Sequence, residues 1–207
     1  MKNIRELVLI LLSAGILMLV MGSAGESAKR TRCMGNLKKL YGMTLSYEND
    51  HGGLPPVTIP AKPLWKFWSH CLRPYSTDKL DFCCPADKRN EYMFKPESPL
   101  FCPVVQSAAS YGMNYFLTAR SAGRAGAPEP RLRFLKNPAG VVLFGDSRGP
   151  YMLPPRFWQH EKDFRHENER ANFVFADGHV EFLRQNDFGT TAPDGSFVTD
   201  FSKWHWN

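Results

Sequence analysis

The N-terminus contains the feature that most limits how this chain can fold. Two cations and one carboxylate in MKNIRE precede LVLILLSAGILMLVMG, which runs from Leu7 to Gly22 without a charge. As a helix this run is roughly 24 Å long, shorter than the ~30 Å hydrocarbon core of a bilayer, and small residues directly after it extend it. A segment this apolar has to be covered by lipid or by protein. We therefore expect a hydrophobic anchor or signal segment over residues 1–28.

The segment SAGESA, which follows the apolar run, leaves two fates open. Its small residues suit a signal peptidase, so cleavage near Ala28 is the alternative to an uncleaved anchor. Lys29 and Arg30 come next, against the preference for cations on the side that is not exported. In both cases we expect residues 29–207 to be exported as one globular head that includes the second half of the N-terminal helix.

A helix is predicted to continue from Ser27 to Asn49. Its apolar positions recur at three- and four-residue steps, namely Leu37, Leu40, Tyr41 and Leu45. Gly52-Gly53 and the two prolines that follow end the pattern. The prediction is one long N-terminal helix whose first half is apolar all round and whose second half docks the head through Leu37, Leu40 and Tyr41.

The C-terminal third has the pattern of a β-sheet. VVLFGDS, residues 141–147, predicts a buried strand, and Asp177-Gly178 between alternating apolar segments predicts a hairpin. A two-residue turn would pair Phe175 with Val180 and Phe173 with Phe182 and place all four on one face, ready to pack against a helix. WKFWSHCLRPY predicts a second short helix. The expected fold class is α+β, a long helix packed on an antiparallel C-terminal sheet.

The five cysteines suit an oxidising compartment. Cys71, Cys83, Cys84 and Cys102 lie in a Pro-rich region, and a bond between the adjacent Cys83 and Cys84 would be strained. We expect Cys71 and Cys102 to share these two between them, with the pairing open. Cys33 is left over. Disulfides are favoured over zinc here because the spacing lacks two Cys-x-x-Cys pairs.

Potential metal ligands or acid/base groups are dense in one place: His160, Glu161, His166, Asp177 and His179. The spacing HEKDFRH is not the His-Glu-x-x-His of helical zinc sites. The chain also has no Gly-x-Ser-x-Gly, phosphate-binding loop or dinucleotide fingerprint. We therefore expect no catalytic residue, no metal and no cofactor, and we interpret His166, Asp177, Gly178 and His179 as structural.

Four stretches together resemble a known group of proteins. They are RCMGNLKKLYGMTLSYENDHGGLPP at 32–56, FCCPADKRN at 82–90, SYGMNYFL at 110–117 and RHENERANFVFADGHVEFL at 165–183. In this order they resemble bacterial pseudopilin-like proteins, relatives of the type II secretion pseudopilins that are abundant in planctomycetes and end in a His-x9-Asp-Gly signature. Here ten residues separate His166 from Asp177, one more than in that group.

The resemblance implies a non-catalytic structural role in a pilin-like fold. Leu7 to Val20 would anchor the protein in the inner membrane as a single pass and pack against other pilin-like subunits, in a type II secretion or type IV pilus-like filament. The head would lie in the periplasm or outside the cell. The prepilin peptidase site, a Gly before an aromatic residue and a Glu, is absent, so processing by that pathway is not expected.

Two other classes of function compete with this one. A secreted carbohydrate- or ligand-binding module is favoured by aromatics with a tendency to be exposed: Trp65, Trp68, Trp158, Trp204 and Trp206. An enzyme comes third. Nucleic acid is not an expected partner, since the formal charge of +6 is spread along the chain without a basic run.

Overall fold

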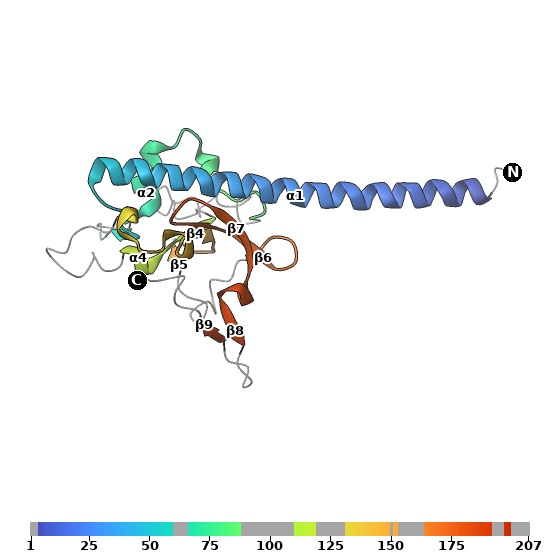
Figure 1. Ribbon diagram of the computed structural model, residues 1–207. Helices are drawn as coiled ribbons and strands as arrows, with labels where there is room; N and C mark the ends of the chain where they lie inside the picture. Colours follow the sequence, from blue (N-terminus) through green and yellow to red (C-terminus); the bar gives the residue numbers. More distant parts are fainter. Residues whose placement is uncertain are drawn as a thin grey trace.

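The computed structural model of the chain has an α+β fold. It describes residues 4–59, 66–87, 110–118, 131–149, 151–152, 164–191 and 197–199. One helix of 48 residues, α1 (Ile4–His51), accompanies a five-stranded sheet. The C-terminal half of α1 lies along the head, and its N-terminal half extends away from it (Figure 1). The expected α+β class and long N-terminal helix are confirmed.

α1 ends where the sequence predicts. Gly52 has a φ of +80°, in the left-handed region that glycine adopts without a steric penalty. Its N–H donates a hydrogen bond of 2.8 Å to the carbonyl of Glu48, which satisfies one of the last carbonyls of the helix. Pro55 and Pro56 then prevent the helix from continuing.

The face of α1 that packs against the head contains fewer residues than the apolar pattern of the sequence predicts. Four side chains at helical spacing are fully buried: Cys33, Leu37, Leu40 and Thr44. Tyr41 is half-buried beside them and packs on the same core, so docking through Leu37, Leu40 and Tyr41 is confirmed. Leu45 is exposed. The buried Thr44 hydroxyl donates a hydrogen bond of 2.8 Å to the carbonyl of Leu40, which compensates for its loss of contact with water.

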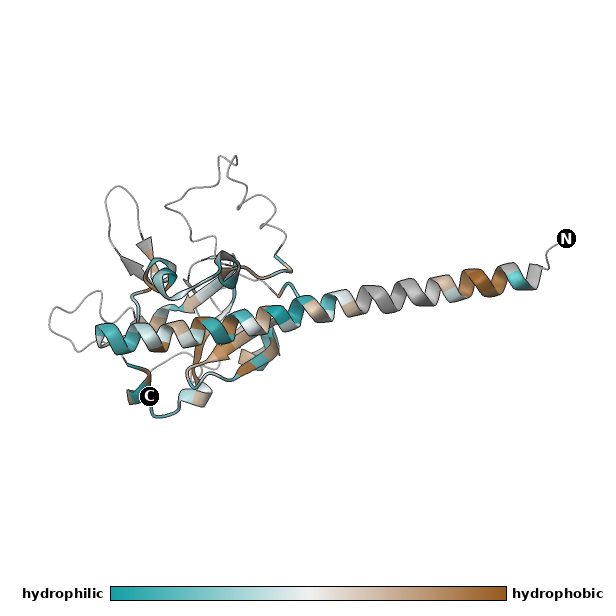
Figure 2. Cartoon of the chain, turned by 90° about the horizontal axis from the view of Figure 1, so that it is seen from above, coloured by the Kyte–Doolittle hydropathy of each residue, from teal (hydrophilic) through white to brown (hydrophobic). Residues whose placement is uncertain are grey.

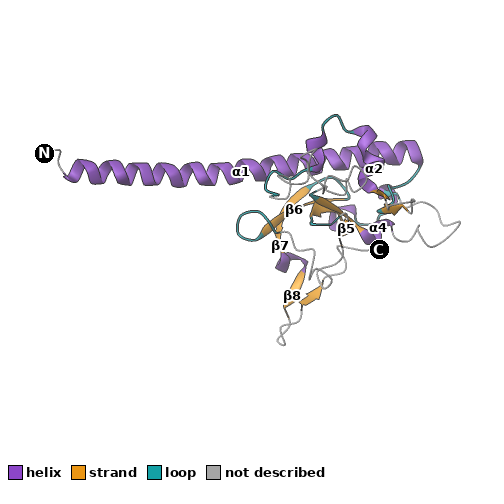
Figure 3. Ribbon diagram, turned by 180° about the vertical axis from the view of Figure 1, so that it is seen from behind, coloured by secondary structure: helices purple, strands orange, loops and turns teal. Residues whose placement is uncertain are grey.

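The sheet has the strand order β5-β3-β4-β6-β7. Its strands are β3 (Tyr111–Asn114), β4 (Val142–Asp146), β5 (Tyr151–Met152), β6 (Arg170–Phe175) and β7 (Val180–Arg184). β3, β4, β6 and β7 pair antiparallel as expected, whereas the edge strand β5 is parallel to β3. α1 packs against β4, β6 and β7 (Figure 1), and Figure 3 shows β6 and β7 beside it from behind.

The hairpin of β6 and β7 exists, but its predicted register is wrong by one residue. Val174 pairs with Val180 and Phe173 with Glu181. Of Asp177 and Gly178 only the glycine has positive φ, so the turn is a three-residue loop, not the two-residue type I′ turn. Since a one-residue slip exchanges the faces, Val174 and Val180 pack in the α1 core and Phe173 and Phe175 in a second cluster.

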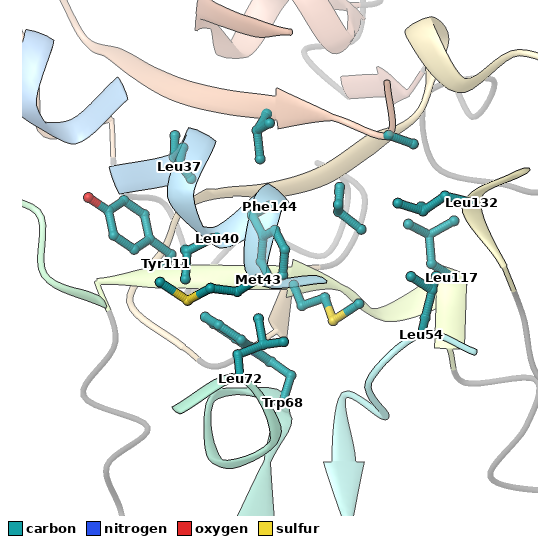
Figure 4. Packing of buried hydrophobic residues seen from close by; sticks show 14 of the residues in the cluster. Leu37, Leu40, Met43, Leu54, Trp68, Leu72, Tyr111, Leu117, Leu132 and Phe144 are labelled. Carbon is teal, nitrogen blue, oxygen red and sulfur yellow. The ribbon is translucent and has the colours of Figure 1, made fainter. Parts of the chain in front are cut away.

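The main core lies between α1, the sheet and the short helix α2 (Trp68–Leu72), and Figure 4 shows its packing. α2 confirms the predicted second helix. The ring of Trp68 is fully buried, with its centroid 4.7 Å from that of Phe144. Trp68 is therefore a core residue and not an exposed aromatic. The other tryptophans, Trp65, Trp158, Trp204 and Trp206, lie outside the described residues.

Short elements complete the head. They are β1 (Thr58–Ile59), β2 (Lys66–Phe67), η1 (Arg73–Tyr75), η2 (Lys79–Phe82), α4 (Tyr115–Thr118), η3 (Leu132–Phe134), η4 (Pro138–Gly140), η6 (Gln185–Phe188), β8 (Gly189–Thr191) and β9 (Phe197–Thr199). The pairs β1–β2 and β8–β9 are separate two-stranded sheets.

The N-terminal half of α1 is an arm with exposed apolar side chains. Residues 8–12 are 47–65% exposed, and the hydrophobic stretch stands apart from the head in Figure 2. Within the described residues, no helix is both long enough and apolar enough to cross a membrane.

Candidate functional site

Four side chains with metal-binding or acid/base chemistry meet where α1 crosses the sheet. We call Cys33, Cys84, Asp146 and His166 the buried cluster. One potential ligand atom from each lies within 4.8 Å of all the others. All four residues are between 0% and 5% exposed. The cluster therefore lies inside the protein.

Helical spacing and strand geometry position two members of the cluster. Cys33 continues the buried stripe of Leu37 and Leu40 by one more turn of α1. Asp146 is the last residue of the fully buried strand β4. Its Oδ2 accepts the backbone N–H of Asn172 at 2.7 Å, across the β4–β6 pair. The carboxylate is therefore held by the sheet itself.

A tight turn before β6 positions His166. The backbone N–H of His166 donates to the carbonyl of Arg170 at 3.1 Å, and the chain turns through Asn168 and Glu169. Both turn residues have positive φ, 56° and 52°, which is uncommon for residues other than glycine. The edge of the imidazole meets the ring of Phe182, with centroids 6.1 Å apart. Its Nε2 points toward Asp146 and Cys84.

Cys84 lies on a loop that is attached to α1. The Asn36 side-chain amide donates to the carbonyl of Cys83 at 2.8 Å inside the protein. Nearby, Lys39 pairs with Asp81 at 2.6 Å. The backbone N–H of Asp87 donates to the carbonyl of Cys84 at 2.9 Å and closes the loop.

The same loop is attached to the sheet by a buried ion pair. The Arg165 guanidinium lies 2.6 Å from the carboxylate of Asp87, and both side chains are at most 6% exposed. A second nitrogen of Arg165 donates to the carbonyl of Ser147 at 2.8 Å. Arg165 and Ser147 each adjoin a member of the cluster, so the cluster has a rigid frame on this side.

Contacts inside the cluster have hydrogen-bond length. Cys33 Sγ lies 3.3 Å from Asp146 Oδ1, and His166 Nε2 lies 3.3 Å from Asp146 Oδ2. His166 Nε2 is also 3.4 Å from Cys84 Sγ. The Tyr111 hydroxyl donates to Cys33 Sγ at 3.5 Å from the adjacent strand β3. Nε2 of His166 is thus in contact with both the Asp146 carboxylate and the Cys84 thiol.

Burial and mutual contact shift the pKa values of the cluster in opposite directions. Burial raises the pKa of Cys33 well above its usual range. Contact with the Cys33 thiol lowers the pKa of Cys84 to about 7 against the effect of burial, and His166 adds to that lowering.

The histidine and the carboxylate favour their charged forms. Burial would lower the pKa of His166, but hydrogen bonds with Asp146 and Cys84 raise it to about 9. Burial would likewise raise the pKa of Asp146, and the hydrogen bond with His166 and the charge of Arg165 instead hold it below its usual value. The cluster therefore combines a buried ion pair with two thiols in contact.

This arrangement suits coordination better than catalysis. Two sulfurs, an imidazole and a carboxylate can bind a tetrahedral divalent cation. A nucleophilic cysteine would need contact with a substrate, whereas Cys33 and Cys84 are both 0% exposed. From the sequence we expect no metal site here. We interpret Cys84 there as a disulfide partner and His166 as part of a turn.

The predicted ligand group around His166 is divided in the structure. Asp177 and His179 lie at the opposite end of β6, where Asp177 Oδ1 accepts from His179 N at 3.1 Å and lies 2.5 Å from its Nδ1. The His179 ring stacks on Phe175 with centroids 4.4 Å apart. These contacts organise the turn. His160 and Glu161 lie outside the described residues.

Gly178 in this turn packs against α1. A Cβ on Gly178 would lie 2.5 Å from Cε1 of Tyr41, and the backbone φ is +90°. Both features require glycine. The Asp-Gly sequence is thus a docking point for the helix as well as a turn.

Cys33, Cys71, Cys83 and Cys84 are all thiols in the structure. Cys102 lies outside the described residues, so the expectation that Cys71 and Cys102 share Cys83 and Cys84 between them stays a prediction. Burial raises the pKa of the Cys83 thiol to about 12, in contrast to its neighbour Cys84. The two adjacent cysteines therefore have different environments.

Comparison of the chain with protein-family models, with curated proteins and with solved structures finds no match in any of the three.

Proposed function

We propose that this chain is a non-catalytic, pilin-like structural protein, tethered to the inner membrane by the N-terminal half of α1, with its head in the periplasm or outside the cell. The observation that carries this proposal is the apolar arm. Val8 to Leu12 are 47–65% exposed on a helix that extends beyond the head. They have no cover within the described part of the chain.

The energetic argument is that such an arm needs a partner. Burying an exposed leucine or isoleucine side chain stabilises by about 1.5–3 kcal/mol. Five consecutive apolar residues exposed on every side of a helix form more than the small patch that is normal on a soluble surface. Lipid covers such a helix on all sides, and so do the apolar helices of neighbouring subunits in a filament.

The head supports the pilin-like part of the proposal. A single helix serves as the arm and, through Leu37 and Leu40, as the core element that packs on the sheet. The two roles are joined without a hinge, because α1 is continuous from Ile4 to His51. A mechanical force on the arm would therefore be transmitted to the head through one continuous helix. This arrangement suits a structural subunit of a secretion or type IV pilus-like filament.

Fractionation of native cells tests the tether. The full-length chain should remain in the inner-membrane fraction after alkaline extraction, with an intact N-terminus by mass spectrometry. Leu11→Asp places a charge in the arm, at a cost of about 2.5–3.5 kcal/mol at the centre of a membrane span, and should release the protein. Leu45→Asp is the matched control, since Leu45 is an exposed leucine of the same helix beside the head.

A soluble protein cleaved near Ala28 would refute the tether. Retention of Leu11→Asp in the membrane, at the same level as Leu45→Asp, would refute the role of the arm.

A further inference from the structure

We propose that Cys33, Cys84, Asp146 and His166 form a closed structural site for one zinc ion, which fixes α1 to the head. The site does not depend on the proposed pilin-like function. Its basis is the convergence of four potential ligands of three types, from four separate segments, on one buried point.

The donor set has the chemistry of zinc. Zinc binds cysteine sulfur, histidine nitrogen and carboxylate oxygen, and its structural sites use four protein ligands in a tetrahedron. Two sulfurs favour zinc over the hard cations magnesium and calcium, which prefer oxygen alone. Two thiolates and one carboxylate also supply more negative charge than a divalent cation needs, which favours retention of the ion.

Several contacts in the buried cluster are as long as the edges of such a tetrahedron. With Zn–S near 2.3 Å and Zn–N and Zn–O near 2.0 Å, ligand atoms around a tetrahedral zinc lie roughly 3.3–3.8 Å apart. Cys33 Sγ to Asp146 Oδ1 is 3.3 Å, and Cys84 Sγ to His166 Nε2 is 3.4 Å. His166 Nε2 to Asp146 Oδ2 is 3.3 Å, a contact with the second carboxylate oxygen, so the carboxylate has to turn slightly for one oxygen to bind the ion. No pair of ligand atoms exceeds 4.8 Å, so shifts of about an ångström close the site.

Outer contacts hold two of the ligands, Cys33 and Asp146, in place. The Tyr111 hydroxyl donates a hydrogen bond to Cys33 Sγ, and the backbone N–H of Asn172 donates one to the Asp146 carboxylate. Such hydrogen bonds orient metal ligands and tune their affinity. These donors come from β3 and β6, so the sheet supplies the support as well as the carboxylate.

Burial makes the site structural. All four ligand residues are at most 5% exposed, so no position is open for water or substrate. The ion would join α1, the Cys84 loop, β4 and the turn before β6. Because the site exists only in the folded chain, the free energy of zinc binding adds to the stability of the head.

Zinc titration of the full-length chain tests the proposal directly. The protein, purified in detergent under reducing conditions, should contain one zinc per chain by mass spectrometry of the metal. Cobalt substitution should give the thiolate-to-cobalt charge-transfer band and the d–d bands of tetrahedral coordination. Chelation should lower the melting temperature.

The matched pair of variants is Cys84→Ser and Cys83→Ser, because the two cysteines are adjacent and both buried. Cys84→Ser should weaken zinc binding by more than the roughly 10- to 100-fold that loss of an outer hydrogen-bond partner costs. Cys83→Ser should bind like the wild type. His166→Gln and His179→Gln form a second pair, in which only the first should lose zinc.

Three results would overturn the proposal. The first is wild-type protein with both thiols intact and no bound zinc. The second is zinc that Cys84→Ser and His166→Gln retain at wild-type affinity. The third is a disulfide at Cys33 or Cys84 in protein isolated from cells, including the predicted bond of Cys84 with Cys71 or Cys102, because an oxidised cysteine cannot supply a thiolate. If Cys84→Ser fails to fold, the cobalt spectrum of the wild type decides the question. A thiolate-to-cobalt charge-transfer band supports the site, and its absence overturns it.

Discussion

The two halves of α1 differ in how their apolar residues are covered. In the N-terminal half Leu9 and Leu11 are 65% and 64% exposed, whereas in the C-terminal half Leu37 and Leu40 are fully buried. Both halves belong to one uninterrupted helix. The difference comes from the sheet, which covers only the second half. Apolar residues in both halves of α1 favour burial. The fold of the chain buries only those that lie beside the sheet.

The largest expected effect is on the covered half. Leu40→Ala should lower the free energy of unfolding of the head by about 2–5 kcal/mol, because it leaves a cavity in the core between α1 and the sheet. Leu9→Ala removes the same atoms from the arm and should change it by no more than about 0.5 kcal/mol. Chemical denaturation of both variants, followed by near-UV circular dichroism, measures the two values. Equal effects would contradict the comparison.

A smaller effect is expected where the hairpin meets the covered half. Gly178→Ala should cost about 2–4 kcal/mol, since a Cβ there meets the Tyr41 ring and the backbone has positive φ. Tyr41→Ala combined with Gly178→Ala removes the clash and leaves the backbone strain. A double-mutant cycle separates the two terms. Simple additivity would show that the glycine does not dock the helix.

The smallest expected effect concerns the pH dependence of the same turn. Burial would raise the pKa of Asp177, but hydrogen bonds from His179 lower it below 3.8. The stabilisation by this carboxylate is thus present above about pH 3.8 and is lost as the pH falls through the lowered pKa. Asp177→Asn keeps an acceptor, so its deficit, about 0.5 kcal/mol at neutral pH because the side chain is exposed to solvent, should vanish in acid. A constant deficit from pH 7 to pH 3 would argue against this.

Local signals predicted the long elements of the fold. The stop at Gly52, the buried strand β4 and the hairpin at Asp177-Gly178 all depend on neighbouring residues, and all three are present. The register of the hairpin was not predictable from Asp-Gly alone, because that dipeptide fits a two-residue and a three-residue loop. In the structure the three-residue loop packs Gly178 against Tyr41, a contact with a residue that is distant in sequence.

The buried cluster had almost no local signal. Cys33 and Asp146 are 113 residues apart, and Cys84 and His166 are 82 residues apart. No short motif spans such distances. One signal was present: Cys33 precedes Leu37 by one helical turn, so the stripe that docks the head includes a thiol. The partners of that thiol follow only from the order of the strands.

The sequence separation of α1 from β4 also has a consequence for the timing of synthesis. At 5–20 residues per second, roughly 6–23 s pass between the synthesis of Cys33 and that of Asp146, 113 residues later. During this interval the stripe of Leu37 and Leu40 has no sheet to pack against. The head can complete its core only after the C-terminal third has emerged, so a nascent chain interrupted before β6 exposes the face that the finished protein buries.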